Sequence, residues 1–119
     1  MVTRLDPLFS AFCARVTHLG PLGCGPVGKT VNNLLHWATI AAITEALTLG
    51  EQLGVPAPRL RAALIGGPTD SRTLRELGQF RLRRWAKDLD NAVAMAAAAG
   101  MDLPLARKVR EAMSSMTAS

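Results

Sequence analysis

The sequence PVGKTVNNLLHWATIAAITEALTLGEQL, residues 26–53, decides the fold of this chain. Within it, the stretch from Val31 to Leu49 carries one charged residue, Glu45, and its apolar side chains lie nearly all the way round a helix. A helix of that kind is buried among other helices. Pro26 suits a first helical turn, and Gly54 suits the position just after a last one. We therefore predict one long central helix from about Pro26 to Leu53.

The same stretch is too polar to be a membrane span. A spanning helix needs about 20 predominantly apolar residues. Polar side chains interrupt residues 31–49, among them Asn32, Asn33, His36, Thr39 and Thr44. We therefore expect no membrane-spanning segment here.

Shorter helices are predicted downstream of the long one. The first covers Arg59 to Ile65, after two prolines, and stops at Gly66-Gly67-Pro68. The next is capped by Asp70 or Ser71 and runs through Trp85, where it either ends or continues past Lys87.

Two further segments complete the chain. The apolar run from Leu89 to Ala99 ends at Gly100, and Asp102 caps a last helix over residues 103–116 with Pro104 in its first turn. The order of these segments predicts an all-α fold, a helical bundle around one long central helix.

Composition agrees with that fold and restricts the function. The chain has 119 residues, of which 49% are hydrophobic and 19% charged, with a net charge of +5. This suits one soluble domain with a core of its own and excludes a disordered chain. Two cysteines, Cys13 and Cys24, make no disulfide scaffold and suit a reducing compartment. Since Met1 to Asp6 does not read as a secretory signal, we predict a cytoplasmic protein.

The beginning of the chain does not match the rest. Leu5 to Ala14 reads as a short amphipathic helix, and Val16 to Leu19 alternates like a short strand. A single strand has no partner with which to pair. We therefore interpret residues 1–19 as the end of a different, sheet-containing domain, and expect this chain to be part of a longer protein.

A glycine-rich turn precedes the long helix. Gly23-Cys-Gly-Pro-Val-Gly28-Lys29-Thr30 fits the phosphate-loop pattern G-x-x-x-x-G-K-S/T. That motif needs a buried strand before it and further parallel strands after it, whereas the sequence after Thr30 reads as helical throughout. Pro26 also removes one N–H donor from the loop. A phosphate-loop nucleotide-binding fragment is therefore kept only as an alternative.

The same residues resemble the signature of a known family. The run from His18 to Asn33, HLGPLGCGPVGKTVNN, is similar to the pattern G-x-x-G-x-G-x-x-x-K-x-x-N-N of the β-hydroxyacid dehydrogenases, which include the 3-hydroxyisobutyrate and tartronate semialdehyde dehydrogenases. Later landmarks resemble the family in the same order: Glu45-Ala-Leu, Lys87-Asp88-Leu89, and Gly100 with Leu103-Pro104-Leu105. The resemblance covers about residues 5 to 116.

The resemblance implies a domain organisation and an activity. Residues 1–19 would be the last helix and strand of an N-terminal dinucleotide-binding domain, and residues 20–119 the C-terminal helical substrate and dimerisation domain. The whole protein would be an NAD- or NADP-dependent dehydrogenase of a small 3-hydroxy acid. Because the segments for the cofactor pyrophosphate and for the substrate carboxylate would lie in the other domain, we expect this chain alone to be inactive.

The resemblance also implies roles for five residues. Lys29 would be the general acid and base on the substrate hydroxyl, Asn33 would bind substrate beside it, and Gly23 and Gly25 would border the substrate. Lys87 would contact the cofactor, although the segment from Ser71 to Lys87 is shorter than is usual in the family. From the residues alone, Lys29 and Asn33 are four apart at the start of a helix and point the same way. Partial desolvation there would favour a neutral amine that exchanges protons near neutral pH.

Simpler interpretations and other partners remain. Both lysines fit solvated surface positions, and the helical domain also fits a free-standing dimerisation or interaction module without catalysis. The sequence favours no nucleic-acid partner, because its arginines between residues 72 and 84 form no single stripe, and it offers no metal site, because its two histidines have no further ligand at a suitable spacing. We expect a homodimer, since the apolar long helix would otherwise stay exposed.

Overall fold

The computed structural model describes residues 25–79 and 82–118, and these form helices joined by turns. The helices are α2 (Pro26–Gln52), α3 (Ala57–Leu64), α4 (Arg72–Arg75), α5 (Trp85–Ala98) and α6 (Pro104–Ala118). None of these described residues lies in a strand, which confirms the predicted all-α class. The helix and strand predicted within residues 1–19 lie outside the described part.

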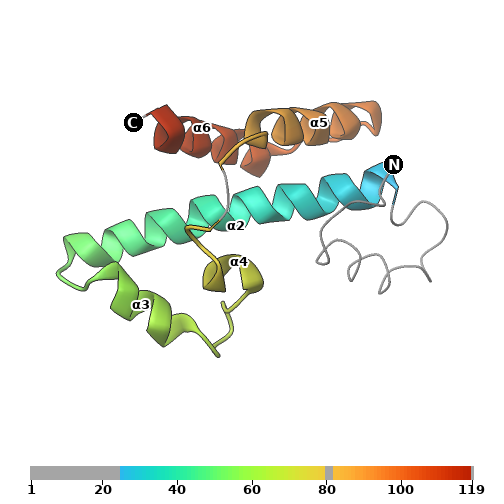
Figure 1. Cartoon of the computed structure of the whole chain (residues 1–119). Coiled ribbons are helices and arrows are strands. Elements are labelled where there is room, and N and C mark those ends of the chain that lie inside the picture. Colours follow the sequence, from blue (N-terminus) through green and yellow to red (C-terminus); the bar gives the residue numbers. More distant parts are fainter. Residues whose placement is uncertain (1–24, 80–81, 119) are drawn as a thin grey trace.

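The long helix α2 is the centre of the arrangement. Helices α5 and α6 pack along one side of α2 and against each other, while α3 and α4 pack against α2 from its other side (Figure 1). The predicted bundle around one long helix is therefore confirmed. The bundle has two parts. Helices α2, α5 and α6 form a three-helix layer, and the shorter helices α3 and α4 cover the second half of α2.

The core lies where α2, α5 and α6 meet. Trp37, Ile40 and Ala41 of α2 are buried there at helical spacing. They pack with one residue of α5 and two of α6: Leu89, Val109 and Met113. Leu89 and Met113 are fully buried, and burying a side chain of that size stabilises a fold by about 1.5–3 kcal/mol. This core fixes α5 against the first half of α2.

The predicted ends of the long helix agree with the structure. Pro26 occupies its first turn, and the N–H of Leu53 donates to the carbonyl of Leu49 at 3.1 Å as the helix closes. Gly54 follows with a φ of +97°, a left-handed conformation that favours glycine. The next helix, α3, begins at Ala57, two residues before the predicted start, because the proline that precedes it already has extended backbone angles.

The prediction of a third helix through Trp85 is wrong. Ser71 does cap a helix, since its Oγ accepts from the N–H of Leu74 at 3.0 Å, but α4 ends after a single turn at Arg75. Gly78 then adopts a φ of +94°, which breaks the helical path, and a separate helix starts at Trp85. The buried side chain of Leu74 anchors this short turn against the bundle, so packing holds it without a longer helix.

Candidate functional site

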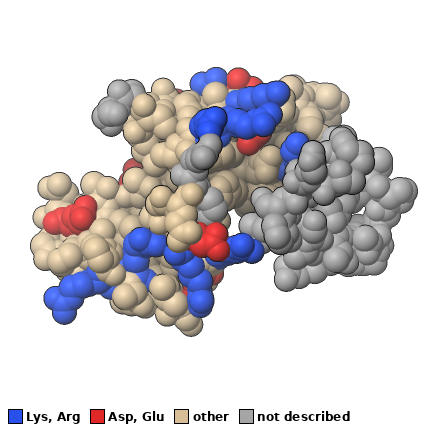
Figure 2. Space-filling model, in the orientation of Figure 1, with Lys and Arg blue, Asp and Glu red and all other residues tan. Residues whose placement is uncertain are grey.

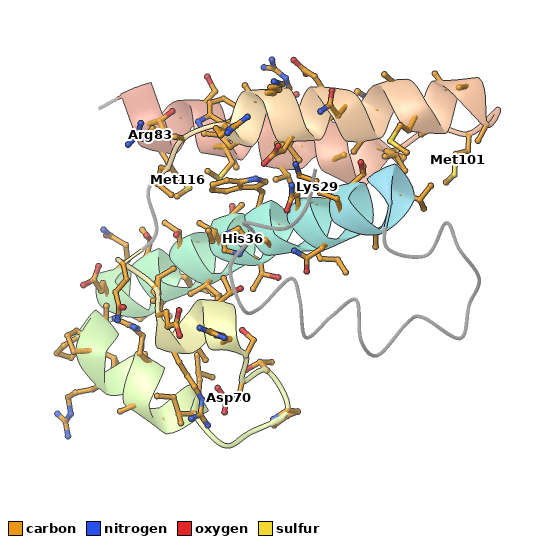
Figure 3. All side chains as sticks on the ribbon, turned by 45° about the vertical axis from the view of Figure 1, so that its right-hand side comes forward. Lys29, His36, Asp70, Arg83, Met101 and Met116 are labelled. Carbon is orange, nitrogen blue, oxygen red and sulfur yellow. The ribbon has the colours of Figure 1, made fainter. Side chains whose placement is uncertain are left out.

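One face of α2 carries both the predicted site and the core. Lys29, Asn33 and Trp37 follow one another at a spacing of four residues, so they lie along the same side of the helix. This side of α2 faces α5 (Figure 3). Trp37 lies in the core on this side, and Lys29 lies nearer the N-terminal end of the helix, at the cavity. The face therefore changes from polar to apolar over two turns.

A cavity of about 610 Å³ lies between the first turns of α2 and the helix α5. Four of the five site residues predicted from the sequence line it: Gly25, Lys29, Asn33 and Lys87. Gly23, the fifth, lies outside the described residues. The short segment between Ser71 and Lys87 thus still brings Lys87 to the cavity that Lys29 lines.

The start of α2 forms one end of the cavity. Gly25 is the N-cap residue, and its carbonyl accepts from the backbone N–H of Lys29 at 3.1 Å. No acidic residue lies in the first turn, so the positive end of the helix dipole is not offset within it. The side chain of Lys29 is exposed. The partial desolvation expected from the sequence is therefore not present.

A hydrogen bond that the sequence did not predict ends on one lining residue of the cavity, Asp88. The indole N–H of Trp37 donates to Oδ2 of Asp88 at 2.9 Å, across 51 positions of sequence. Trp37 is only 5% exposed, so this bond joins the core to a carboxylate that lines the cavity. A tryptophan four residues beyond Asn33 was the available signal, because a buried indole N–H normally finds an acceptor.

Within the described residues, the glycine patterns at the start of α2 are not followed by the parallel sheet that they need. Besides the phosphate loop, Gly23, Gly25 and Gly28 have the G-x-G-x-x-G spacing of a dinucleotide-binding turn. Both motifs belong to a turn within a parallel sheet, and residues 25–79 and 82–118 include no strand. The hydroxyl of Thr30, which would hold magnesium in a phosphate loop, instead donates to Sδ of Met95 at 3.1 Å.

The cavity collects positive charge. Lys29, Arg84 and Lys87 line it, with Asp88 as the carboxylate among its lining residues. None of the three cations forms an ion pair with any residue of the described ranges. The amides of Asn33 and Asn91 also line the cavity, and each can donate or accept hydrogen bonds.

Two arginines between residues 72 and 84 pair with carboxylates outside the cavity. Arg72 pairs with Glu76 at 2.8 Å, and Arg75 pairs with Asp70 at 2.6 Å. The Arg75 guanidinium, through its hydrogen bond to Asp70, lowers the pKa of that carboxyl to about 2. Figure 2 shows Lys and Arg side chains in separate groups, over α3 and α4 and over the upper helices. The basic residues thus form no continuous surface in this view.

The described part of the chain lacks two further features. Its helices include no segment with the length and hydropathy that crossing a membrane would require. Its His, Cys, Asp and Glu side chains form no group of three or more that could hold a metal ion.

Comparisons with known proteins point to one family. A family model described as "NAD-binding of NADP-dependent 3-hydroxyisobutyrate dehydrogenase" matches residues 23–119. The chain is 32% identical over 111 residues to 2-hydroxy-3-oxopropionate reductase of Escherichia coli. This match covers 85% of this chain and 38% of that protein. It is 35% identical over 63 residues to 2-(hydroxymethyl)glutarate dehydrogenase of Eubacterium barkeri, covering 53% and 21%. A probable 3-hydroxyisobutyrate dehydrogenase of Mycobacterium tuberculosis is 32% identical over 63 residues, with the same coverage. The chain therefore spans well under half the length of these relatives.

Proposed function

Because this chain belongs to the β-hydroxyacid dehydrogenase family, we propose that it forms the substrate side of an NAD(P)-dependent dehydrogenase of a small 3-hydroxy acid. Residues 20–119 would be the C-terminal helical domain of that enzyme, responsible for substrate binding and dimerisation. The observation that carries the proposal is the cavity that Gly25, Lys29, Asn33 and Lys87 line together. A cavity of this size suits a small-molecule ligand.

Lys29 is proposed as the general acid and base. When the hydroxy acid is oxidised, the nicotinamide supplies the hydride acceptor for the hydrogen on the carbinol carbon. Lys29 is exposed in this chain, so its desolvation would have to come from bound substrate and cofactor. Its neutral amine would then take the hydroxyl proton while the C–O bond becomes a carbonyl, and the ammonium would return a proton in the reverse direction. The place of Lys29 in the first turn of α2, among the residues that line the cavity, supports this role.

The other predicted residues are proposed to bind and orient. The amide of Asn33, one turn beyond Lys29, can hold the substrate hydroxyl or orient the amine. Gly25, and Gly23 outside the described residues, would let the substrate approach the backbone at the positive end of α2. Lys87 is proposed to contact the cofactor from α5. The described residues include no pyrophosphate-binding sheet, so Lys87 fits an edge contact to the cofactor rather than part of a complete cofactor site.

The test of this function is a pair of lysine variants in the complete gene product. Lys29→Met should lower kcat for NAD(P)-dependent oxidation of a small 3-hydroxy acid by at least about 100-fold, a typical contribution of general acid–base catalysis. Added primary amines should restore part of the rate. Lys108→Met is the control, because Lys108 is exposed on α6 and paired with Glu111 at 3.8 Å. A Lys29→Met enzyme with unchanged kcat would contradict the acid–base role.

We also propose that a polypeptide of these 119 residues alone has no turnover and no tight affinity for nicotinamide dinucleotides. The reason is that a dinucleotide is normally held by a strand-turn-helix within a parallel sheet. A dehydrogenase rate above background from the purified polypeptide would refute this.

A homodimer is the second part of the proposal. The side of α2 opposite its core face carries exposed apolar residues at helical spacing: Val27, Val31, Leu35, Leu49 and Leu53. An exposed apolar stripe of this length is typical of an association surface. The same stripe is what favours the alternative function, a dimerisation module without catalysis. The cytoplasmic location remains a prediction from cysteine usage.

A further inference from the structure

The charge of the cavity is not balanced by the protein. Lys29, Arg84 and Lys87 contribute three positive charges to its lining, and Asp88 contributes one negative charge. One oxygen of Asp88 already accepts the indole N–H of Trp37. Elsewhere in the described residues, most surface cations meet carboxylates, as Arg75 meets Asp70 and Arg110 meets Asp90. Like charges that are kept together at the cost of mutual repulsion suit an anionic ligand.

The backbone adds to this positive field. The cavity is bordered by the beginnings of two helices, because Lys29 lies in the first turn of α2 and Lys87 in the first turn of α5. The N-terminal end of each helix carries a partial positive charge. Asp88 is the acidic residue in the first turn of α5, and α2 has none there. Side chains and helix ends therefore act in the same direction.

Arg84 reaches the cavity through an unusual backbone conformation. It is the N-cap residue of α5 with a φ of +66°, and the described residues contain no other positive φ outside glycine. A left-handed conformation costs free energy for any side chain, and such residues cluster at functional sites. Its neighbour Arg83 is also exposed but does not line the cavity, and lies apart from Lys29 in Figure 3.

We propose that this cavity binds a small molecule with two negative charges, and that Arg84 selects the second anionic group. The planar guanidinium can hold a carboxylate or phosphate through two parallel hydrogen bonds. In the cofactor-free chain, Lys29 and Lys87 add positive charge for the first group, and the amides of Asn33 and Asn91 line the cavity beside them. With Lys29 in its ammonium form, Asp88 limits the excess to two positive charges, which matches a dianion better than a monoanion.

Combined with the proposed function, on which this step rests, the inference narrows the substrate class. The substrate would be a 3-hydroxy acid with a second carboxylate or a phosphate group. The binding of a dianion rests on the cavity alone and does not require the dehydrogenase activity.

The experiment titrates the full 119-residue chain with simple anions. Malonate, glutarate, inorganic phosphate and acetate are compared by calorimetry and by NMR shifts of the Asn33 and Asn91 amides. The titrations are made at about 0.01 M and about 0.15 M salt, because screening weakens a charge-driven site. At least one dianion should bind about tenfold more tightly than acetate, as one charge-assisted hydrogen-bond pair would give.

Two matched arginine variants separate a site from general surface charge. Arg84→Gln should reduce the affinity for the dianion to about that for acetate, while Arg83→Gln, which changes the net charge equally, should leave it unaltered. Circular dichroism checks that both variants stay helical. Asp88→Asn keeps an acceptor for Trp37 and removes a negative charge, so it should tighten the binding of every anion.

The outcomes are decisive in each direction. Tighter binding of a dicarboxylate, or of phosphate, supports the site and identifies which anionic group it takes. Equal affinities for acetate and all dianions, or equal losses in Arg83→Gln and Arg84→Gln, would overturn the proposal. If dianions bind as expected but Lys29→Met leaves turnover intact, the dehydrogenase proposal fails and the anion site stands.

Discussion

Trp37 connects the stability of the bundle to the geometry of its site. Its rings pack in the core with Leu89 and Met113, while its N–H holds the carboxylate of Asp88 at 2.9 Å. Asp88 is adjacent in sequence both to Lys87, which lines the cavity, and to Leu89, which is fully buried. The position of the site lysine on α5 is therefore set by core packing one and two residues away.

We predict that Trp37→Phe destabilises the chain by about 1.5 kcal/mol, because a hydrogen bond to a charged group is lost while most of the ring packing remains. Urea unfolding measures the change. A double-mutant cycle with Asp88→Ala is the control. A coupling energy of about 1 kcal/mol is expected for two directly bonded side chains, and strictly additive effects would show that the bond contributes nothing.

At the scale of the element, the sequence predicted helices with clear start and stop residues correctly, and it failed for the one helix without a clear stop. The long helix, its glycine stop and the last helix are recognisable because each has its own local signals, namely Pro26, Gly54 and Pro104. The segment after Ser71 has a good cap but no stop signal stronger than Gly78. Its single turn is kept by the burial of Leu74, a tertiary contact that no local pattern reveals.

The site divides in the same way. Lys29 and Asn33 could be placed together from a spacing of four within one helix, and Lys87 from resemblance alone. Arg84, Asp88 and the Trp37 bond could not, because they depend on where α5 begins and how it lies against α2. The left-handed conformation of Arg84 has no sequence signal of its own, since arginine is not a residue that favours it.

The carboxylate of Asp70 holds the loop between α3 and α4, and this predicts that the stability of the fold depends on pH. Asp70 accepts from the backbone N–H of Gly66 at 2.9 Å and pairs with the Arg75 guanidinium. The hydrogen bond from Arg75 comes first among the causes that lower the pKa of Asp70 from 3.8 to about 2. A carboxyl whose pKa is lower in the folded state stabilises it above the unfolded pKa, and this contribution disappears as the pH falls through the folded value.

Asp70→Asn should therefore be less stable than the parent chain at neutral pH, and the difference should shrink between about pH 4 and about pH 2. The midpoint of urea unfolding, followed against pH for both chains, measures this. Glu51→Gln removes an exposed carboxylate that has no ion pair among the described residues, so its difference from the parent should stay nearly constant. A difference for Asp70→Asn that does not change with pH would contradict the assignment.

At the scale of the whole molecule, α2 has two faces with different tasks. One side contacts α5 and α6 through the core, and α3 and α4 cover part of its second half. The opposite side exposes Val27, Val31 and Leu35, with Leu49 and Leu53 continuing the stripe. These five side chains, with Leu53 just after the last residue of α2, fall within an arc of about 100° at 100° per residue, so they form one seam along the helix. The exposed Glu45 lies in the same arc and interrupts the seam between Leu35 and Leu49.

A second copy of the chain that pairs through this seam would bury it by a two-fold, self-complementary contact, the commonest arrangement in homo-oligomers. We predict a dimer by light scattering at about 100 μM, well above the dissociation constants of specific interfaces. Leu35→Glu places a charge in the seam at a side chain that is 61% exposed, and should give a monomer with unchanged helicity. Leu105→Glu makes the same change at a 70% exposed side chain on α6, outside the seam, and should leave the dimer intact. A monomeric parent chain, or a dimer that Leu35→Glu does not weaken, would show that the seam is not an interface between copies, and the apolar face of α2 would then need a different partner.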